Sequence, residues 1–257
     1  MVPAVTDSIS RFSNRVSDYV RFRPSYPREI LGLLARDCAL SPESIVADIG
    51  SGTGILTRLF LDHGDTVFAV EPNAAMRAAA EKEFGANPRF RSIDGRAEST
   101  TLSNGRASIV SAGQAFHWFD PPRARAEFQR ILAPGGWTAL IWNERRLTGS
   151  PFLAAYEEFL QTWGVDYAQV AAAYPQFGHL EAFFHPSAMR SASFPNSQRF
   201  DFEGLRGRLL SASYAPPSGH PKHEPMIAAL SRLFEEHRED GQVEIDYDCA
   251  VYYGRLE

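Results

Sequence analysis

The sequence predicts an α/β fold in which helices pack on a mostly parallel β-sheet. Short apolar segments alternate with segments of helical spacing over residues 28–143. Three glycines at alternate positions, Gly50, Gly52 and Gly54, follow the first of these apolar segments. An acidic residue, Glu71, ends the second apolar segment. Together these observations indicate βαβ units with a ligand site beyond the carboxyl ends of the strands.

The first part of the chain supplies five predicted strands and the helices between them. Residues 8–27 suggest a short helix that ends in a proline-rich turn. The predicted strands are residues 44–49, 66–70, 89–93, 107–112 and 137–142. The predicted helices are residues 28–40, 55–62, 74–84 and 123–132. A turn is expected at Ala133-Pro134-Gly135-Gly136, before the fifth strand.

The second part is less regular and richer in helical patterns. Helices are predicted over residues 150–163, 168–174, 178–184, 203–212 and 223–238. A strand is expected within residues 190–202. A long final strand is predicted over residues 242–253, where Val243, Ile245 and Tyr247 alternate with polar residues.

Composition excludes several classes of protein. The chain has 257 residues, a formal net charge of −5 and 44% hydrophobic residues, which is ordinary for a globular protein. It has no long run of Lys and Arg, so we expect no nucleic-acid partner. No stretch approaches the roughly 18 apolar residues of a membrane span, and the start has no signal-peptide pattern. We therefore expect a cytoplasmic protein with no membrane partner.

The metal-ligating residue types are not arranged as a metal site. Cys38 and Cys249 are the two cysteines, and they lie far apart without metal-site spacing. His179 and His185 have no partner at ligand spacing either. We expect free thiols in a reducing compartment and no bound metal.

The glycine turn predicts a nucleotide-type ligand. Glycine lacks a Cβ, so the backbone turns tightly and comes close to a bound molecule. The dinucleotide fingerprint requires a third glycine or alanine at the position that Ile55 occupies, and no Gly-Lys-Ser/Thr of a P-loop follows. The turn therefore favours a nucleoside ligand without a pyrophosphate. The alternative is a βα loop without a ligand. In such a loop, nothing would offset the conformational entropy that three glycines lose on folding.

Glu71 is the predicted ribose ligand. It stands 21 positions after Gly50, at the end of the second strand. Its carboxylate can accept hydrogen bonds from both ribose hydroxyls and would repel a 2′-phosphate. The alternative is a solvated carboxylate at a strand end.

The motifs, taken in order, resemble those of a known family. They are Asp48-Ile49-Gly50-Ser51-Gly52-Thr53-Gly54, Val70-Glu71-Pro72-Asn73 with Met76, Asp94-Gly95-Arg96-Ala97-Glu98, Gln114-Ala115-Phe116-His117-Trp118-Phe119 and Leu132-Ala133-Pro134-Gly135-Gly136. This set resembles the class I S-adenosylmethionine-dependent methyltransferases. The start at residues 19–27 and the His-Trp-Phe run are similar to the small-molecule subgroup of trans-aconitate methyltransferase-like proteins (methyltransferase type 11). The resemblance covers residues 10–143 firmly and the rest loosely.

The resemblance implies a doubly wound, Rossmann-like sheet of seven strands, with the final strand antiparallel. It implies a cofactor-binding core with an N-terminal lid over residues 1–149 and a helical cap inserted after strand five over residues 150–190. The remainder of the core sheet, strands six and seven, would occupy residues 191–257.

The resemblance also implies roles for individual residues around S-adenosyl-L-methionine. The turn from Gly50 to Gly54, with Ser51, Gly52 and Thr53, would contact its methionine portion, with Asp48 near the amino group and Gln114 beside it. Glu71 would hold the ribose. The adenine would be lined by Asn73, Met76, Ala97 and Glu98. Tyr19, Arg23 and Tyr26 would fold over the cofactor, with Arg23 able to pair with a carboxylate.

The reaction implied is methyl transfer to a small organic acceptor, and the subgroup suggests a carboxylic acid. His117 is the candidate general base, or a donor to the acceptor, and the alternative is a hydrogen bond that fixes its loop. Tyr26, Trp118, Asn143 and Arg145 are further candidates for the acceptor site, although Trp118 suits packing and arginines are usually solvated. Asp120 is expected to cap a helix.

Other functions remain open from the sequence alone. One is a non-catalytic sensor or regulator that binds S-adenosylmethionine, since fold does not settle catalysis. Another is a nicotinamide-dependent oxidoreductase, which Ile55 argues against. The expected partner is a small-molecule acceptor, and the expected state is a monomer or homodimer.

Overall fold

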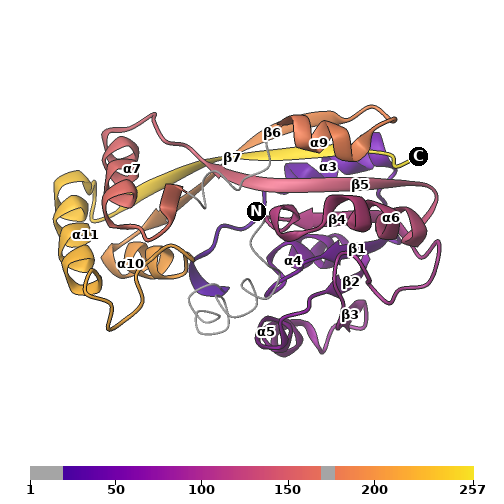
Figure 1. The fold of residues 1–257 in the computed structure, drawn as a ribbon, viewed down its shortest axis with the longest axis horizontal. Coiled ribbons are helices and arrows are strands. Elements are labelled where there is room, and N and C mark those ends of the chain that lie inside the picture. Colours follow the sequence, from indigo (N-terminus) through magenta and orange to yellow (C-terminus); the bar gives the residue numbers. More distant parts are fainter. Residues whose placement is uncertain (1–19, 169–176) are drawn as a thin grey trace.

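The computed structural model describes residues 20–168 and 177–257 (Figure 1). Its strands are β1 (Ile45–Ile49), β2 (Thr66–Val70), β3 (Phe90–Ile93), β4 (Ala107–Gly113), β5 (Leu132–Arg145), β6 (Arg190–Phe200) and β7 (Val243–Gly254). Its helices are α3 (Glu29–Cys38), α4 (Ile55–His63), α5 (Ala74–Phe84), the 3-10 helix η1 (Phe116–Trp118), α6 (Pro121–Ile131), α7 (Pro151–Trp163), α9 (Phe177–Phe184), α10 (Phe202–Leu210) and α11 (His223–His237). Tyr19, with the rest of residues 8–19 of the predicted short helix, and residues 169–174 of the helix predicted over 168–174 lie outside the described residues.

The strands form a seven-stranded sheet in the order β3-β2-β1-β4-β5-β7-β6. The first five strands are parallel, and β7 is antiparallel to both β5 and β6. This confirms the predicted doubly wound sheet with an antiparallel last strand. After β1 the chain forms β2 and β3 on one side of β1, and it then crosses to form β4 on the other side. The point where strand order reverses therefore lies between β1 and β4, where open α/β sheets bind ligands.

The start of β5 differs from the prediction. A turn was expected at residues 133–136, but the strand ladder already begins at Leu132, which pairs with Ala107. The next aligned pair is Ile109 with Trp137, so the extra residues of β5 bulge out between two paired positions. Gly135 has a φ of 77°, a conformation that glycine adopts without strain. Pairing on both sides of the bulge makes this segment part of the strand.

Side-chain caps explain where two helices of the sheet begin. The Asn73 side chain accepts hydrogen bonds from the backbone nitrogens of Ala75 and Met76, at 3.0 and 3.2 Å, at the start of α5. The Asp120 side chain accepts one from the backbone nitrogen of Arg123 at 3.2 Å, ahead of the two prolines that open α6. The predicted cap at Asp120 is confirmed.

The molecule has two ends joined by long strands (Figure 1). We call β1 to β4 with α3 to α6 the sheet end, and α7, α10 and α11 with the adjoining parts of β6 and β7 the helical end. The helical end has a core of its own, to which Tyr156, Leu209 and Leu230 contribute from its three helices. β5, β6 and β7 have 14, 11 and 12 residues, whereas β1 to β4 have between 4 and 7. These longer strands therefore extend past the sheet end and carry the helical end.

The helices of the helical end come from two parts of the chain. α7 follows β5 directly, whereas α10 and α11 lie between β6 and β7. α9 instead packs at the sheet end, where Phe183 contacts Phe128 of α6. The division into three segments at residues 149 and 190 stays a prediction.

Three further features bear on the sequence-based expectations. Cys38 and Cys249 are buried and free. Across residues 20–168 and 177–257, no cluster of three or more His, Cys, Asp and Glu side chains is placed to hold a metal ion. None of the helices in these same ranges is long and apolar enough to cross a membrane.

Candidate functional site

The glycine turn connects β1 to α4 at the reversal point of the sheet. Gly50, Gly52 and Gly54 have φ angles of 67°, 57° and 88°, which side chains rarely tolerate. The backbone nitrogens of Gly50 and Ser51 donate to the carbonyl oxygen of Val70, at 2.8 and 3.1 Å. A Cβ on Gly50 would lie 2.7 Å from that of Ala115. The turn is therefore held against the end of β2 and against the loop after β4.

Glu71 follows β2 and braces this turn. One carboxylate oxygen accepts a hydrogen bond from the backbone nitrogen of Gly52 at 2.9 Å, and the other accepts one from that of Asn73 at 2.8 Å. The side chain is buried, and this burial raises its pKa. Each carboxylate oxygen has a second acceptor site, so the group can still receive hydroxyl donors from a ligand.

Asp48 is the last polar side chain of β1 and is fully buried. Its Oδ2 accepts a hydrogen bond from the hydroxyl of Thr57 at 2.7 Å. Within the described parts of the chain, its Oδ1 has no hydrogen-bond partner. Burial raises the pKa of this carboxyl to about 7. An unsatisfied carboxylate oxygen in a closed site favours a cationic donor such as an ammonium group.

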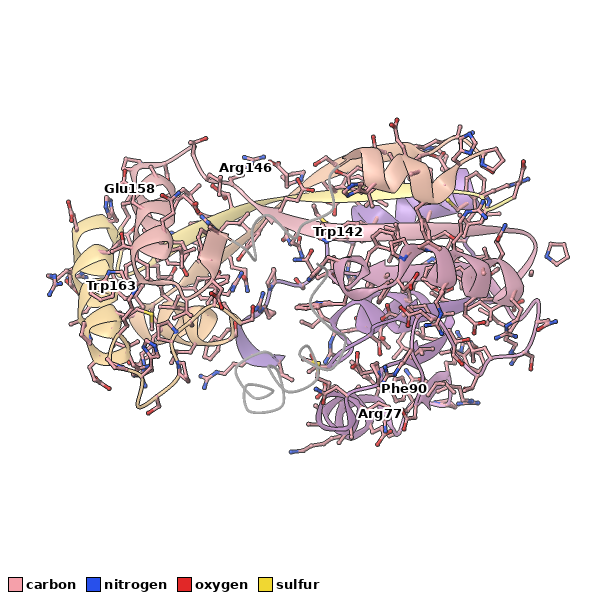
Figure 2. All side chains as sticks on the ribbon, viewed as in Figure 1. Arg77, Phe90, Trp142, Arg146, Glu158 and Trp163 are labelled. Atoms are coloured by element: carbon pink, nitrogen blue, oxygen red, sulfur yellow. The ribbon has the colours of Figure 1, made fainter. Side chains whose placement is uncertain are left out.

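A cavity of about 420 Å³ opens beside the turn and extends to the helical end. Of the predicted site residues, it is lined by Arg23, Tyr26, Asp48, Gly50, Ser51, Gly52, Gln114, Asn143 and Arg145. Predicted residues that do not line it are Thr53, Gly54, Glu71, Asn73, Met76, Ala97, Glu98, His117 and Trp118. The cavity also has Trp142 on its wall, on the strand that joins the two ends (Figure 2).

Several of the residues that do not line the cavity support the turn or the loop after β4. Met76 is buried, and its sulfur would lie 3.7 Å from a Cβ on Gly52. Ala97 is buried, and Glu98 accepts a hydrogen bond from the backbone nitrogen of Asp120 at 2.8 Å. Glu98 thus fixes the start of α6 in this structure.

His117 lies on η1, and burial lowers its pKa to about 4. Its ring centroid is 4.8 Å from that of Trp118. The imidazole is therefore neutral at pH 7, and its low pKa makes it a weak base. A role for His117 in the reaction stays a prediction.

Gln114 and Asn143 connect the ends of β4 and β5. The Gln114 side chain accepts a hydrogen bond from the backbone nitrogen of Asn143 at 2.9 Å and donates to its carbonyl oxygen at 3.4 Å. The Asn143 amide donates to the carbonyl oxygen of Ser25 at 3.2 Å and accepts from Asn196 at 2.9 Å. The side chain of Arg23 donates to the carbonyl oxygen of Ser211 at 2.9 Å. The segment of residues 23–26 is thus tied to both ends of the molecule.

Arg145, at the end of β5, belongs to a closed polar cluster. Its guanidinium forms a short ion pair with Glu157 of α7 and donates to the hydroxyl of Tyr167 at 2.9 Å. That hydroxyl donates to Glu157 at 2.6 Å. Arg145 lines the cavity as predicted, but Glu157 already neutralises its charge.

Sequence reasoning missed the second arginine of the helical end, Arg208 on α10. It lines the cavity and is 7% exposed. A signal was available, because Leu205, Arg208 and Leu209 share one face of a helix by spacing, and both leucines are buried. An arginine in the buried stripe of a short amphipathic helix indicates a polar partner inside the protein.

Residues 47–140 match the family model described as "Methyltransferase domain". An uncharacterized methyltransferase of Mycobacterium tuberculosis is 38% identical over 134 residues, which are 52% of this chain and 52% of that protein. The chain thus matches about half the length of that relative. An uncharacterized methyltransferase of Schizosaccharomyces pombe is 25% identical over 240 residues, with 91% of this chain and 85% of that protein covered.

Solved structures share the fold along most of the chain. A candidate type II methyltransferase of Anaeromyxobacter dehalogenans superimposes with a TM-score of 0.67 at 22% identity, covering 91% of this chain and 98% of that one. A protein of Geobacter sulfurreducens, solved with bound S-adenosyl-L-homocysteine, gives a TM-score of 0.53 at 18% identity, covering 97% and 98%. At these identities the likeness concerns the fold.

Proposed function

We propose that this chain, which carries a class I S-adenosylmethionine-dependent methyltransferase domain, transfers a methyl group from S-adenosyl-L-methionine to a small organic acceptor. One observation carries the proposal. The buried carboxylates of Asp48 and Glu71 flank a glycine turn at the reversal point of the sheet, and a cavity of about 420 Å³ leads from this turn to the helical end. That volume is in the range of small-molecule sites.

The residues at the turn fit the cofactor. The free Oδ1 of Asp48 suits the amino group of the methionine portion, and the backbone of Gly50 and Gly52 reaches the cavity wall without side chains. The remaining acceptor sites of Glu71 suit two ribose hydroxyls. We propose that Met76 and Ala97 pack near the adenine and that Asn73 and Glu98 act by holding α5 and the loop before α6.

The bound cofactor supplies an electrophilic methyl group on a sulfonium. The protein's contribution is to hold the acceptor's nucleophile in line with that methyl and to exclude water. Trp142, Tyr26 and Gln114 line the cavity beside the turn and restrict the space there. If the acceptor is a carboxylic acid, as we propose, its ionised oxygen is already nucleophilic and no general base is required.

Direct binding measurements test the cofactor assignment. Isothermal titration calorimetry of the full chain with S-adenosylmethionine, S-adenosylhomocysteine and NAD should show binding of both adenosyl ligands and none of NAD. Tight binding of NAD without the adenosyl ligands would overturn the proposal in favour of an oxidoreductase.

A turnover assay separates an enzyme from a sensor. S-adenosylmethionine is incubated with a library of small acceptors, and release of S-adenosylhomocysteine is followed by mass spectrometry. Acceptor-dependent release supports the methyltransferase. Binding of the adenosyl ligands with no release across the library would favour the non-catalytic reading.

A further inference from the structure

Arg208 is a buried cation without a counter-ion among the residues that the structure describes. Its side chain lines the cavity, and its Nε donates to the hydroxyl of Tyr247 at 3.3 Å. Within residues 20–168 and 177–257, no carboxylate forms an ion pair with it, and its two Nη nitrogens donate to no protein atom. Guanidinium groups stay protonated in proteins, so this charge persists at every physiological pH.

The neighbouring acidic groups are already used or face elsewhere. Glu157 is bound by Arg145 and Tyr167, as described above. Glu144 also lines the cavity. In the register of β5 against β7, Glu144 lies opposite Asp248, and Arg145 lies opposite Tyr247, which is the hydrogen-bond partner of Arg208. Successive residues of a strand point to opposite faces, so the side chain of Glu144 leaves the sheet on the face away from Tyr247.

A buried, unpaired cation is costly for folding. Burying a charge without a counter-ion is much less favourable than burying an apolar side chain in the same place. The surrounding wall offers tyrosines, Tyr247 and Tyr214 among them, and these donate or accept hydrogen bonds without balancing the charge. A ligand anion would supply the missing partner, since a carboxylate matches the planar fork of a guanidinium.

The position of α10 indicates which part of the acceptor would carry the carboxylate that pairs with Arg208. α10 belongs to the helical end, and the glycine turn belongs to the sheet end (Figure 1). Residues of both line the cavity. We propose that Arg208 anchors a carboxylate of the acceptor at the helical end, away from the transferred methyl group. The acceptor is then an anion with a second nucleophilic group, which the anchor directs toward the glycine turn. This inference rests on the proposed methyl transfer.

The test compares carboxylates with neutral analogues of the same shape. The probes are glutarate and adipate against glutaramide and adipamide, and 4-hydroxybenzoate against 4-hydroxybenzamide. Their binding is measured by calorimetry with and without saturating S-adenosylhomocysteine. Methylation of each is followed with S-adenosylmethionine by product mass. At least one carboxylate should bind, and its neutral analogue should not. Methylation is compared only between 4-hydroxybenzoate and 4-hydroxybenzamide, because both keep the phenol as a nucleophile whereas the diamides keep none.

Two substitutions at Arg208 and one matched control complete the test. R208Q should raise the KM for the carboxylate about thirty-fold or more while the Kd for S-adenosylhomocysteine stays within about two-fold, as expected for one lost charged hydrogen-bond pair. R208K keeps the charge without the fork and should lie between R208Q and wild type. R206Q removes an exposed arginine of the same helix, paired with Glu203, and should behave as wild type.

The outcomes are distinguishable. Unchanged carboxylate KM in R208Q, a preference for the neutral analogues, or binding of no carboxylate by the protein would each overturn the anchor proposal and leave the methyltransferase intact. Failure to bind either adenosyl ligand would instead overturn the proposed function, and the titrations without S-adenosylhomocysteine would still report on Arg208.

Discussion

The sheet end and the helical end bury side chains of opposite charge. At the sheet end, Asp48 and Glu71 are buried carboxylates with no cationic side chain bonded to their oxygens within the described ranges. At the helical end, Arg208 is a buried guanidinium with no counter-ion in the described part of the chain, and the second arginine, Arg145, is neutralised by Glu157. An ammonium group suits the sheet end, and a carboxylate suits the helical end. The pattern matches a cationic cofactor at one end and an anionic acceptor at the other.

The largest expected effect is a difference in the free energy of unfolding between variants of Arg145 and Arg208. R145M leaves the partly buried carboxylate of Glu157 with only neutral partners, so we expect the free energy of unfolding to fall by about 3 kcal/mol. R208M removes a cation without leaving an unpaired carboxylate behind, so its free energy of unfolding should stay within about 1 kcal/mol of that of wild type. Urea denaturation followed by circular dichroism measures both.

Equal destabilisation by R145M and R208M would contradict the asymmetry between the two arginines. It would mean that the fold itself depends on the Arg208 cation, for example through its bond to Tyr247. R206M on the same helix serves as the reference for replacing an exposed arginine.

The second prediction concerns Glu71 at the sheet end. E71A should raise the Kd for S-adenosylhomocysteine by roughly ten- to a hundred-fold, because it removes ribose hydrogen bonds worth roughly 1.5–3 kcal/mol and also the acceptor that braces the Gly52 nitrogen. E71Q keeps one acceptor oxygen and should lose less. Calorimetry measures both, with the thermal midpoint as a check on folding. A Kd equal to that of wild type in E71A would remove Glu71 from the site.

The site residues of the sheet end were easier to predict from the sequence than those of the helical end. Asp48, the glycines and Glu71 fall within 24 consecutive residues, counted from Asp48 to Glu71, and each motif directly follows a strand. Their place at the carboxyl edge follows from the parallel βαβ order alone. The strands and helices of residues 28–143 were likewise predicted closely, because apolar periodicity is a local property.

The helical end depends on contacts that no local pattern encodes. Arg145, Glu157, Arg208 and Tyr247 come from four elements spread over a hundred residues, and only the antiparallel register of β7 against β5 places Tyr247 opposite Arg145. Arg145 was selected because it follows the predicted fifth strand, residues 137–142, but the sequence did not reveal that Glu157 would neutralise it. The bulge at the start of β5 was missed because glycine and proline signal turns and bulges alike.

The third prediction is the pH dependence of cofactor affinity. The pKa of Asp48 is about 7 in the free protein, and an ammonium group bound beside it would favour the ionised form and lower that pKa. Below pH 7 the carboxyl must therefore lose a proton on binding, so affinity falls as pH falls. A free α-amino group loses its own charge with a pKa of about 7.7–8.0, so affinity should peak between pH 7 and 8.

Calorimetry with S-adenosylhomocysteine should show about five-fold weaker binding at pH 6 than at pH 7.5, the change expected when the Asp48 proton and the ligand amine are both linked to binding. D48N can keep the hydrogen bond from Thr57 and cannot ionise, so its binding should be weaker and flat across this acid range. The same slope in D48N and wild type would assign the pH dependence to another group.

The smallest expected effect is at His117 on η1, which does not line the cavity. It is absent from the cavity wall, and a pKa of about 4 makes it a weak base at neutral pH. An acceptor that is methylated on a carboxylate needs no base, so H117A should then change turnover and the Kd for S-adenosylhomocysteine by less than about three-fold. H117N, which keeps a hydrogen-bonding side chain on the loop, is the control. A fall in turnover of a hundred-fold or more with unchanged affinity would instead make His117 the base of the reaction. It would point to an acceptor that is methylated on a group that must first lose a proton, with the carboxylate at Arg208 as its anchor alone.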